Sequence, residues 1–346
     1  GRKMSKSLGN SPDPIELIEK YGADGVRMGM LLASPAGNDL PFDESYCEQG
    51  RNFSNKIWNA LRLIKSQKVE DIPQSNSSKL AIEWFRAKIN QTLSLLEDDF
   101  SKYRLSESLM RVYKFIWDDF CSWYLEIIKP AYQSPMDKAT YEQTLDIFET
   151  LMKILHPFMP FVTEEIYHLI REREEKDFIM LAQMPVVQPF DEKLLADFEF
   201  VQEFVACIRA VRNEKNIPQK NTLEAFFAKT AEAEVVEKYS ELITKLCNLQ
   251  TLALCDQKVE KSVAKMVRTM EVFVPFADNI NKEEEIKKIN EEIKYFEGFK
   301  ASVEKKLANE NFVNKAPQKV VDTERKKLSD CEQKLQTLRE QLAGLA

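Results

Sequence analysis

The sequence predicts a mainly α-helical protein with three parts: a helical bundle, a small α+β unit and a C-terminal antiparallel coiled-coil hairpin. Only 9 of the 346 residues are glycine and 30% are charged, a composition that favours long helices over a glycine-rich sheet. Apolar residues recur at helical spacing along most of the chain. From residue 281 onward they narrow to a single heptad seam.

The first helices carry clear start and stop signals. In "SPDPIELIEKYG", Asp13 is an expected N-cap, Pro14 suits the first turn and Gly22 ends the helix. A second short helix follows and ends before Pro35, because the residue preceding a proline avoids the helical region.

The segment from 43 to 187 reads as a bundle of antiparallel helices. "RNFSNKIWNALRLI" places Phe53, Ile57, Leu61 and Ile64 on one stripe. Prolines and a polar break at 72–78 separate the next helical patterns. These patterns cover 79–100, 105–130, 137–155 and 157–173. The tryptophans on these stripes (Trp58, Trp84, Trp117 and Trp123) are expected in the core.

The segment from 188 to 280 reads as one long helix followed by a small α+β unit. After Pro218 the apolar residues alternate in places, which is typical of strands. Short strands are expected at 222–228, 251–255 and 271–276, around a helix at 232–247.

The last segment, 281–346, has nearly balanced charges and a narrow apolar seam. Ile286, Ile289, Ile293 and Phe296 begin the seam, and Lys300 interrupts it. Pro317 cannot continue a helix, so the chain is expected to turn back there. Two such helices joined by a short loop predict an antiparallel hairpin whose remaining surface stays in water.

Charge and cysteine usage restrict the class of protein. The formal net charge is -7, so any nucleic-acid contact must come from local basic patches. Six cysteines form no CxxC pair and the two histidines lie 12 apart, so neither a metal site nor a disulfide framework is expected. No apolar run is long enough to span a bilayer. We expect a cytoplasmic monomer that binds neither membranes nor DNA.

The string "KMSKS" at residues 3–7 is the most specific motif. Two ammonium groups on a serine-rich loop can meet negative charge that grows on phosphates in a transition state. The string resembles the KMSKS signature of class I aminoacyl-tRNA synthetases. The resemblance implies an ATP-binding loop of Lys3, Met4, Ser5, Lys6 and Ser7, with Lys3 and Lys6 as catalytic residues. It also implies ATP as a substrate, accompanied by magnesium.

Further strings are similar to the same family. "RNFSNKIWNALR", "FIWDDFCSWYLEIIK" and "LHPFMPFVTEEIY" resemble its anticodon-binding helical bundle. "KLANENFVNKAPQKVVDTERKKL" within a coiled coil is similar to the valyl enzymes. The resemblance implies an end of the catalytic region (1–42), an anticodon-binding bundle (43–187), a helix with a small α+β unit (188–280) and a tRNA-binding arm (281–346).

Polar and basic residues form three clusters suited to RNA. On the expected anticodon helix they are Arg51, Asn52, Lys56, Asn59 and Arg62. Arg209 and Arg212 lie on the long helix that follows the bundle. The arm contributes Lys305, Lys306, Lys315, Lys319, Arg325 and Lys326. By resemblance the partner is tRNA(Val), recognised through folded shape and unstacked bases.

The resemblance implies valine–tRNA ligase activity for a longer parent protein. The HIGH signature of the family does not occur here, so the chain alone is expected to bind tRNA without aminoacylating it. One alternative is the same region of an isoleucyl- or leucyl-tRNA synthetase. The other is a helical coiled-coil scaffold that binds protein partners, which the acidic net charge would suit.

Overall fold

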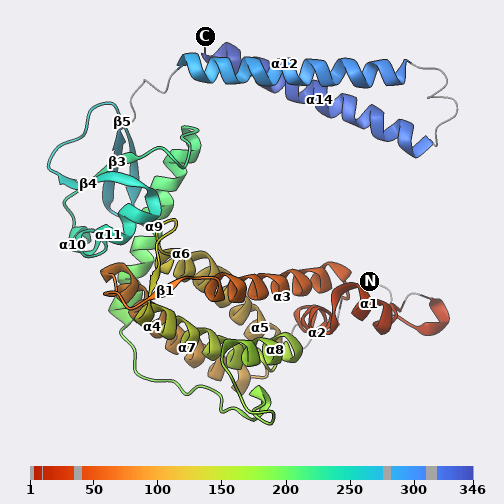
Figure 1. Cartoon of the computed structure of the whole chain (residues 1–346), viewed down its shortest axis with the longest axis vertical. Coiled ribbons are helices and arrows are strands. Elements are labelled where there is room, and N and C mark those ends of the chain that lie inside the picture. Colours follow the sequence, from red (N-terminus) through yellow and green to blue (C-terminus); the bar gives the residue numbers. More distant parts are fainter. Residues whose placement is uncertain (1–3, 10, 35–40, 276–281, 309–317, 346) are drawn as a thin grey trace. The chain divides into compact units, whose positions relative to one another are not determined.

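The computed structural model describes residues 4–9, 11–34, 41–275, 282–308 and 318–345 (Figure 1). The chain divides into two compact units, Gly1–Pro275 and Phe276–Ala346. Helices dominate both units, which confirms the mainly helical class predicted from the sequence. The four-part division into functional regions stays a prediction.

The first unit begins with three helices: α1 (Pro14–Tyr21), α2 (Ala23–Leu32) and α3 (Glu44–Lys65). The Asp13 carboxylate accepts a hydrogen bond from the Ile15 N–H at 2.7 Å, which confirms the predicted N-cap. Gly22, at φ +78°, ends α1 as expected. The turn between α1 and α2 therefore follows from local sequence alone.

Helices α2 and α3 approach each other through glycines. A Cβ built on Gly29 would lie 2.6 Å from Cys47 Sγ and 2.8 Å from the Cys47 backbone nitrogen. A Cβ on Gly50 would lie 2.7 Å from the Gly25 carbonyl oxygen. The two backbones are in direct contact, so α2 can pack against α3 in only one position.

The bundle continues with α4 (Asn76–Ser101), α5 (Leu105–Lys114), α7 (Lys138–Leu155) and α8 (Pro160–Ile170). The single helix predicted over 105–130 is instead three pieces. Between α5 and α6 (Leu125–Ile128) lies a ten-residue π-helix, η2 (Phe115–Tyr124). Apolar periodicity alone cannot distinguish this wider helix from an α-helix.

Aromatic side chains fill the centre of the bundle. The Phe85 and Phe115 rings stack with centroids 5.1 Å apart, and Phe120 stacks on Phe148 at 5.4 Å. A short parallel pair, β1 (Val69–Glu70) with β2 (Met136–Asp137), ties the end of α3 to the start of α7.

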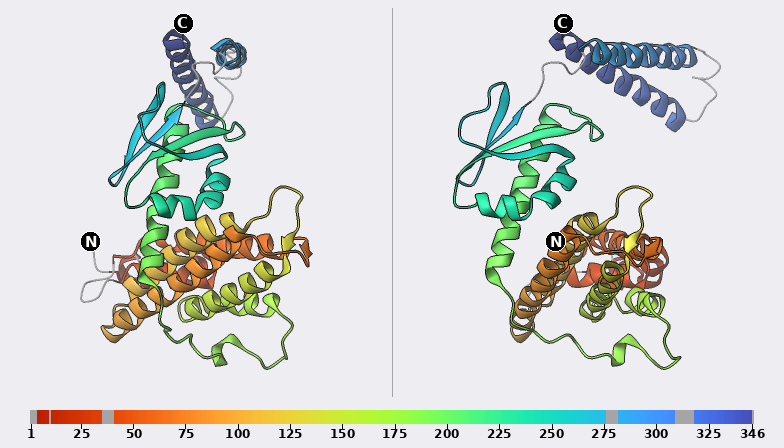
Figure 2. Two further views of the ribbon diagram at one scale, coloured as in Figure 1. Left: turned by 90° about the vertical axis from the view of Figure 1, so that its left-hand side faces the viewer. Right: turned by 60° about the vertical axis from the view of Figure 1, so that its left-hand side comes forward.

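Helix α9 (Glu192–Glu214) follows an irregular segment that contains one short turn, η3 (Ile179–Leu181), and packs against both the bundle and the sheet (Figure 2). The sheet order is β4-β3-β6-β5, with β3 parallel to β4 and the other pairs antiparallel. The strands are β3 (Leu223–Ala228), β4 (Leu249–Cys255), β5 (Ser262–Val267) and β6 (Met270–Pro275).

Three of these strands confirm the prediction, whereas β5 was missed. The predicted helix at 232–247 is two helices, α10 (Ala233–Lys238) and α11 (Ser240–Cys247), separated at the fully buried Tyr239. Lys245 on α11 donates to the Ile127 and Lys129 carbonyl oxygens, both at 2.6 Å. The sheet part is thereby attached to the end of α6.

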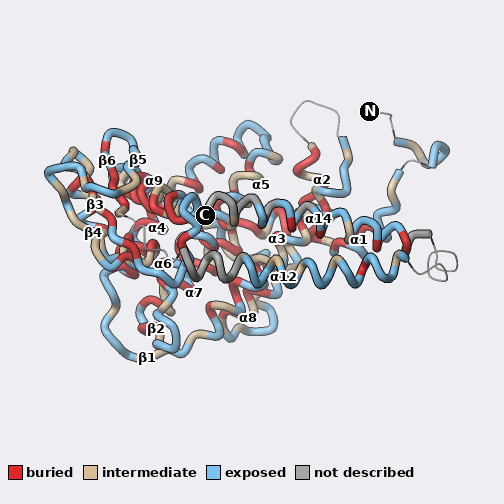
Figure 3. Tube along the Cα trace, turned by 90° about the horizontal axis from the view of Figure 1, so that it is seen from above, coloured by how far each residue is buried: buried red, intermediate tan, exposed pale blue. Residues whose placement is uncertain are grey.

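The second unit is a pair of helices, α12 (Lys282–Leu307) and α14 (Gln318–Leu345). Lys300 pairs with Glu332 and Glu297 with Arg339, each at 2.7 Å, so the helices run in opposite directions as predicted. Among the described side chains of the two helices, the buried apolar ones are Val303, Val321, Cys331, Leu335 and Leu338, and the side chain of Glu324 is buried as well. Most other described positions of the two helices are exposed (Figure 3).

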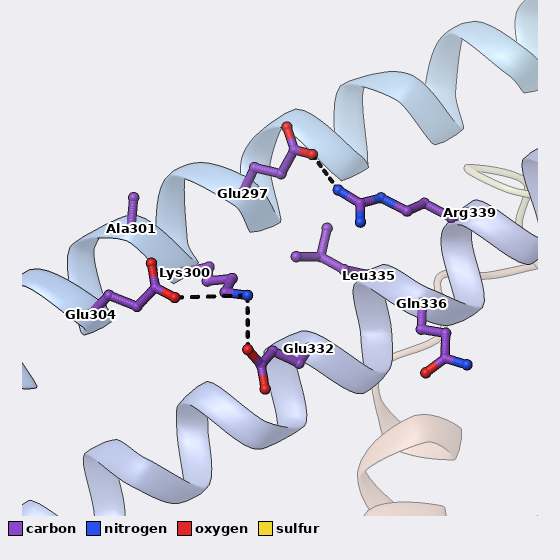
Figure 4. A pocket seen from close by; sticks show the side chains of 8 residues that line it. All are labelled: Glu297, Lys300, Ala301, Glu304, Glu332, Leu335, Gln336 and Arg339. Atoms are coloured by element: carbon purple, nitrogen blue, oxygen red, sulfur yellow. Dashed lines mark hydrogen bonds and ion pairs between the residues drawn. The ribbon is translucent and has the colours of Figure 1, made fainter.

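Lys300 interrupts the seam as the sequence predicted. Its ammonium group lies 2.7 Å from Glu332 and 3.7 Å from Glu304 (Figure 4). Lys300 is one wall of an open groove of about 610 Å³, which is also lined by Ala301 and Leu335. None of the helices in the described part of the chain is long and apolar enough to cross a membrane.

Candidate nucleic-acid interface

The predicted RNA-facing residues of α3 lie on one helix but differ in exposure. Asn52, Asn59 and Arg62 are exposed, whereas Arg51 and Lys56 are half-buried. Arg51 reaches Glu48 at 3.2 Å, and Lys56 Nζ lies 5.2 Å from the centre of the Trp117 ring. Of the predicted residues, the exposed ones on α3 are therefore two amides and, near its C-terminal end, one guanidinium.

Trp58 adds an aromatic ring to this surface. The prediction that it lies in the core is wrong, because its side chain is 36% exposed. Its spacing from Asn55 and Arg62, three and four residues, was the signal that it shares their face. An exposed indole beside amides and a guanidinium is a suitable platform for an unstacked base. Trp84, in contrast, is buried as predicted.

Arg212 requires a correction. It was predicted to contact RNA, but it is 1% exposed. Its guanidinium donates to the carbonyl oxygens of Pro218 at 2.9 Å, Asn221 at 2.8 Å and Cys247 at 2.8 Å. All these acceptors belong to the chain turn after α9 and the end of α11. Arg212 therefore satisfies buried carbonyl groups and is not part of the described surface.

Arg209, one turn earlier, keeps part of its side chain at the surface. Its Nη2 atom donates to the Leu246 carbonyl oxygen at 3.1 Å, and the guanidinium lies 5.7 Å from the centre of the Trp123 ring. Its contact with RNA stays a prediction.

The basic residues of the hairpin lie on both helices. Lys305, Lys306, Arg325 and Lys326 are exposed. Lys306 lies 3.9 Å from Glu324, and Arg325 lies 3.7 Å from an acid one turn earlier. The Arg325 pair is exposed and therefore weak, and Lys306 is itself exposed although Glu324 is buried, so a polyanion can compete for these cations. Lys315 and the side chain of Lys319 lie outside the described residues.

The KMSKS segment forms a tight turn in its described part. Ser5 and Ser7 hydroxyls lie 3.0 Å apart, and the Leu8 N–H donates to the Ser5 carbonyl oxygen at 3.2 Å. A short 3₁₀ turn covers Lys6–Leu8, and Gly9 has φ +62°. Lys3 and the side chain of Lys6 lie outside the described residues, so their roles stay predictions.

A shallow, open surface depression of about 560 Å³ lies between this turn and the start of α3. Its lining includes Met4 and Gly9 on one side and Phe42, Asp43 and Glu44 on the other. Glu44 accepts from Lys20 Nζ at 2.8 Å and from the Tyr21 hydroxyl at 2.9 Å. These bonds fasten α1 to the beginning of α3.

Metal-ligating residues do not gather in the described ranges. Within them, no three His, Cys, Asp or Glu side chains lie together in a way that could hold a metal ion. The described part of the KMSKS segment contributes serine hydroxyls, and the far side of the adjacent depression carries the carboxyl groups of Asp43 and Glu44.

Three family models match the chain. Residues 1–43 match the model of class I tRNA synthetases (I, L, M and V), residues 83–227 the anticodon-binding domain of tRNA ligases, and residues 281–346 the valyl tRNA synthetase tRNA-binding arm. The KMSKS turn, the bundle and the hairpin thus each match a region of tRNA synthetases, the first of them a region of the class I enzymes. The arm model favours the valyl enzymes over the isoleucyl and leucyl alternatives.

Relatives agree along the whole chain. A valine–tRNA ligase of Parabacteroides distasonis is 53% identical over 346 residues, and that of Fusobacterium nucleatum is 37% identical over 360 residues. The chain is, over its whole length, a homologue of valine–tRNA ligases. It spans 39% and 40% of the length of these two relatives while 100% and 99% of the chain is matched. A solved structure, the LeuRS–tRNA–LeuAMS complex of Agrobacterium radiobacter K84, aligns with 80% of this chain and with 31% of its own chain. The TM-score is 0.40 and the sequence identity is 15%, so this similarity carries no argument about the fold.

Proposed function

We propose that this chain is the tRNA-binding part of a valine–tRNA ligase. The complete enzyme would join L-valine to tRNA(Val) with conversion of ATP to AMP and pyrophosphate. The observation that carries the proposal is the match of the whole chain to valine–tRNA ligases, including a tRNA-binding arm at 281–346. The chain alone is expected to bind tRNA and not to aminoacylate it.

Recognition would use two surfaces of different character. On α3, Trp58 offers a stacking platform, while Asn59 and Arg62 can hydrogen-bond to the edges of unstacked anticodon bases. On the hairpin, Lys305 and Lys326 would contact phosphates of the folded tRNA, with no base reading of their own. Affinity would therefore fall steeply with salt, whereas identity would depend on the α3 surface.

The KMSKS segment would act on ATP in the complete enzyme. Lys3 and Lys6 would meet the negative charge that develops on the phosphates, and the hydroxyls of Ser5 and Ser7 would help to shape the turn. Magnesium would arrive with ATP. The protein is expected to act as a cytoplasmic monomer.

Binding of the chain to labelled tRNA(Val) tests the proposal. The competitors are tRNA(Ile) and a tRNA(Val) with a changed anticodon, at low and physiological salt. We expect tRNA(Val) to bind more tightly and the anticodon change to remove that preference. Trp58→Ala should weaken tRNA(Val) binding by about tenfold, since stacking on one aromatic side chain contributes about 1–3 kcal/mol.

Trp84→Phe is the matched control, because that tryptophan is buried in the bundle and stacks on Phe198. It should leave tRNA affinity unchanged. Equal and weak binding of all three RNAs would remove anticodon reading from the proposal and leave only electrostatic contact. Absence of binding at low salt would instead favour the scaffold alternative.

A further inference from the structure

Tyr132 is an aromatic side chain that the fold leaves almost entirely in water. It is 92% exposed and lies in the loop 129–135, between α6 and β2. This loop, drawn in yellow, protrudes from the bundle (Figure 2). Single exposed apolar side chains are common on protein surfaces, so the surroundings of the ring decide what it can do.

The loop is held at both of its ends by other segments. Where it begins, the Lys245 ammonium group donates to the carbonyl oxygens of Ile127 and Lys129, both at 2.6 Å. Where it ends, the Met136 N–H donates to the Lys68 carbonyl oxygen at 2.8 Å, and β2 pairs with β1. A loop fixed in this way loses little conformational freedom when it binds a ligand, so its contacts contribute more fully to affinity.

A tight turn carries the ring within this loop. The Ser134 N–H donates to the Ala131 carbonyl oxygen at 2.9 Å, which places Tyr132 and Gln133 at the two central positions of the turn. Gln133 has φ +63°, a left-handed conformation that few residues other than glycine adopt. The backbone therefore has a defined shape here and presents Tyr132 at the tip of the turn.

The loop lies at the same end of the bundle as the exposed residues of α3. Trp58 is seven residues before the last residue of α3, which is about 10 Å along the helix axis. Lys68, whose carbonyl group accepts from Met136, follows the end of α3 by three residues. Tyr132 and Trp58 are thus two exposed rings at one end of the bundle.

Two exposed lysines flank the loop. Lys129, at its start, lies 3.9 Å from Glu126. Lys68, beside its end, lies 2.6 Å from Glu70. The side chains of both pairs are 42–75% exposed, so the pairs are weak and a phosphate group can compete for the ammonium groups.

We infer that Tyr132 is a second base-stacking residue of the bundle, which takes an unstacked base of the tRNA anticodon loop while Lys68 and Lys129 contact the neighbouring phosphates. The inference rests on the proposed function. Residues 83–227, which include this loop, match the anticodon-binding domain of tRNA ligases. Bases in RNA loops can leave the stack and lie against an aromatic ring, and every base has a face that can stack.

The test measures binding of labelled tRNA(Val) to the whole chain and to Tyr132→Ala, Tyr132→Phe and Lys129→Ala, over a series of salt concentrations. We expect Y132A to raise Kd by about tenfold at every salt concentration, because stacking releases no counterions. Y132F keeps the ring and should remain within about twofold of the unsubstituted chain. K129A should instead lower the slope of log Kd against log salt by about 0.7, because one phosphate contact is lost.

Tyr103→Ala is the matched control. Tyr103 is 85% exposed and stands between two basic residues in the turn after α4. Gln74, just before α4, donates to Thr140 at the start of α7 at 3.0 Å, so the loop 129–135 lies near the other end of α4. That helix has 26 residues and is about 39 Å long. Y103A should therefore leave tRNA affinity unchanged, and both alanine variants should keep the melting temperature, because the two side chains are exposed.

The outcomes separate the two proposals. If the unsubstituted chain does not bind tRNA(Val) at low salt, the proposed function fails, and the stacking role of Tyr132 fails with it. If that chain binds and Y132A retains full affinity, the stacking role fails while the function stands. An equal loss in Y103A would also overturn the role, because any exposed tyrosine would then suffice. A loss in Y132F as large as in Y132A would assign the contact to the hydroxyl group and overturn stacking.

Discussion

The α2–α3 pair and the α12–α14 pair join helices in opposite ways. In α2–α3, Gly29 and Gly50 let the backbones touch, and there is no space for one more carbon atom. In α12–α14, a narrow row of side chains such as Val303 and Leu335 forms the contact, and most of the surrounding surface is exposed. Glycine contact fixes one geometry, whereas a seam distributes its stability over many small contacts.

Charge at a helix interface follows the same division. Asp119 of the π-helix is largely buried and lies 4.0 Å from Lys88 Nζ, and burial raises the pKa of its carboxyl group to about 6. Lys300 of the hairpin has two acidic partners and remains partly in water, and hydrogen bonding to Glu332 raises its pKa. The charged form is therefore disfavoured at Asp119 and favoured at Lys300.

The largest expected effect is that of Gly29→Ala. The new Cβ would lie 2.6 Å from Cys47 Sγ and 2.8 Å from the Cys47 backbone nitrogen, so α2 and α3 must move apart. We expect the free energy of unfolding of the first unit to fall by about 3 kcal/mol, measured by urea denaturation. Adding Cys47→Ala should restore only part of this loss, because the backbone contact remains. A loss below about 0.5 kcal/mol would show that the helices separate freely.

Asp119→Asn should have the next largest effect and the opposite sign. Because the folded pKa of about 6 exceeds the unfolded value of about 3.9, the stability that protonated Asp119 provides is complete below pH 4 and is lost as the pH rises through 6. Asparagine removes that loss. We expect about 2 kcal/mol of added stability near pH 7.5 and little change near pH 4, from urea titrations of both proteins. Destabilisation near pH 7.5 with little change near pH 4 would mean that attraction to Lys88 dominates over the cost of burial.

Gly298→Ala repeats the glycine substitution in the hairpin, where the comparison predicts a gain. A Cβ on Gly298 meets nothing within 4 Å, and alanine favours the helix. Hydrogen exchange of the α12 amides in the whole chain should show added protection of about 0.5–1 kcal/mol. A loss of protection would contradict the view that this pair of helices has room for added atoms.

The smallest effect is expected for Glu297→Gln. Its partner Arg339 lies at 2.7 Å, but both side chains are more than half exposed. Protection of the α12 amides should fall by less than G298A raises it, and high salt should remove the difference. A larger, salt-independent loss would show that this pair behaves like the buried contacts of the first unit.

Local signals in the sequence predicted much of the fold. Three local features are found where expected, because each depends on residues nearby in the chain. They are the N-cap at Asp13, the helix end at Gly22 and the interruption of the apolar seam at Lys300. The π-helix was not predicted, because apolar periodicity does not distinguish it from an α-helix. Strand β5 was missed although its sheet partner β6 is the next strand in the chain, because Val267 is its one buried residue and the alternation is weak. In the candidate site, the polar and basic residues predicted for α3 lie on one helix, and their contact with RNA stays a prediction. The exposure of Trp58 was not predicted.

Arg209 and Arg212 show why a site list is harder to predict than a helix. Both are arginines on α9, one turn apart, and composition cannot separate them. Arg212 lies four residues after Ile208 and directly after Val211, both fully buried, so the apolar stripe contained the signal. The apolar stripe could not show why an arginine is buried there. The reason is that three carbonyl groups of other segments need a hydrogen-bond donor.

The enclosed guanidinium of Arg212 also gives the protein an internal standard for chemical footprinting. A reagent that modifies arginines should label Arg62 readily and Arg212 only after the unit opens, because its donors are occupied and its side chain is 1% exposed. Protection of Arg62 by tRNA can then be distinguished from damage to the fold in one experiment. Modification of Arg212 would show that the first unit has unfolded, so that labelling of Arg62 no longer reports on the folded surface.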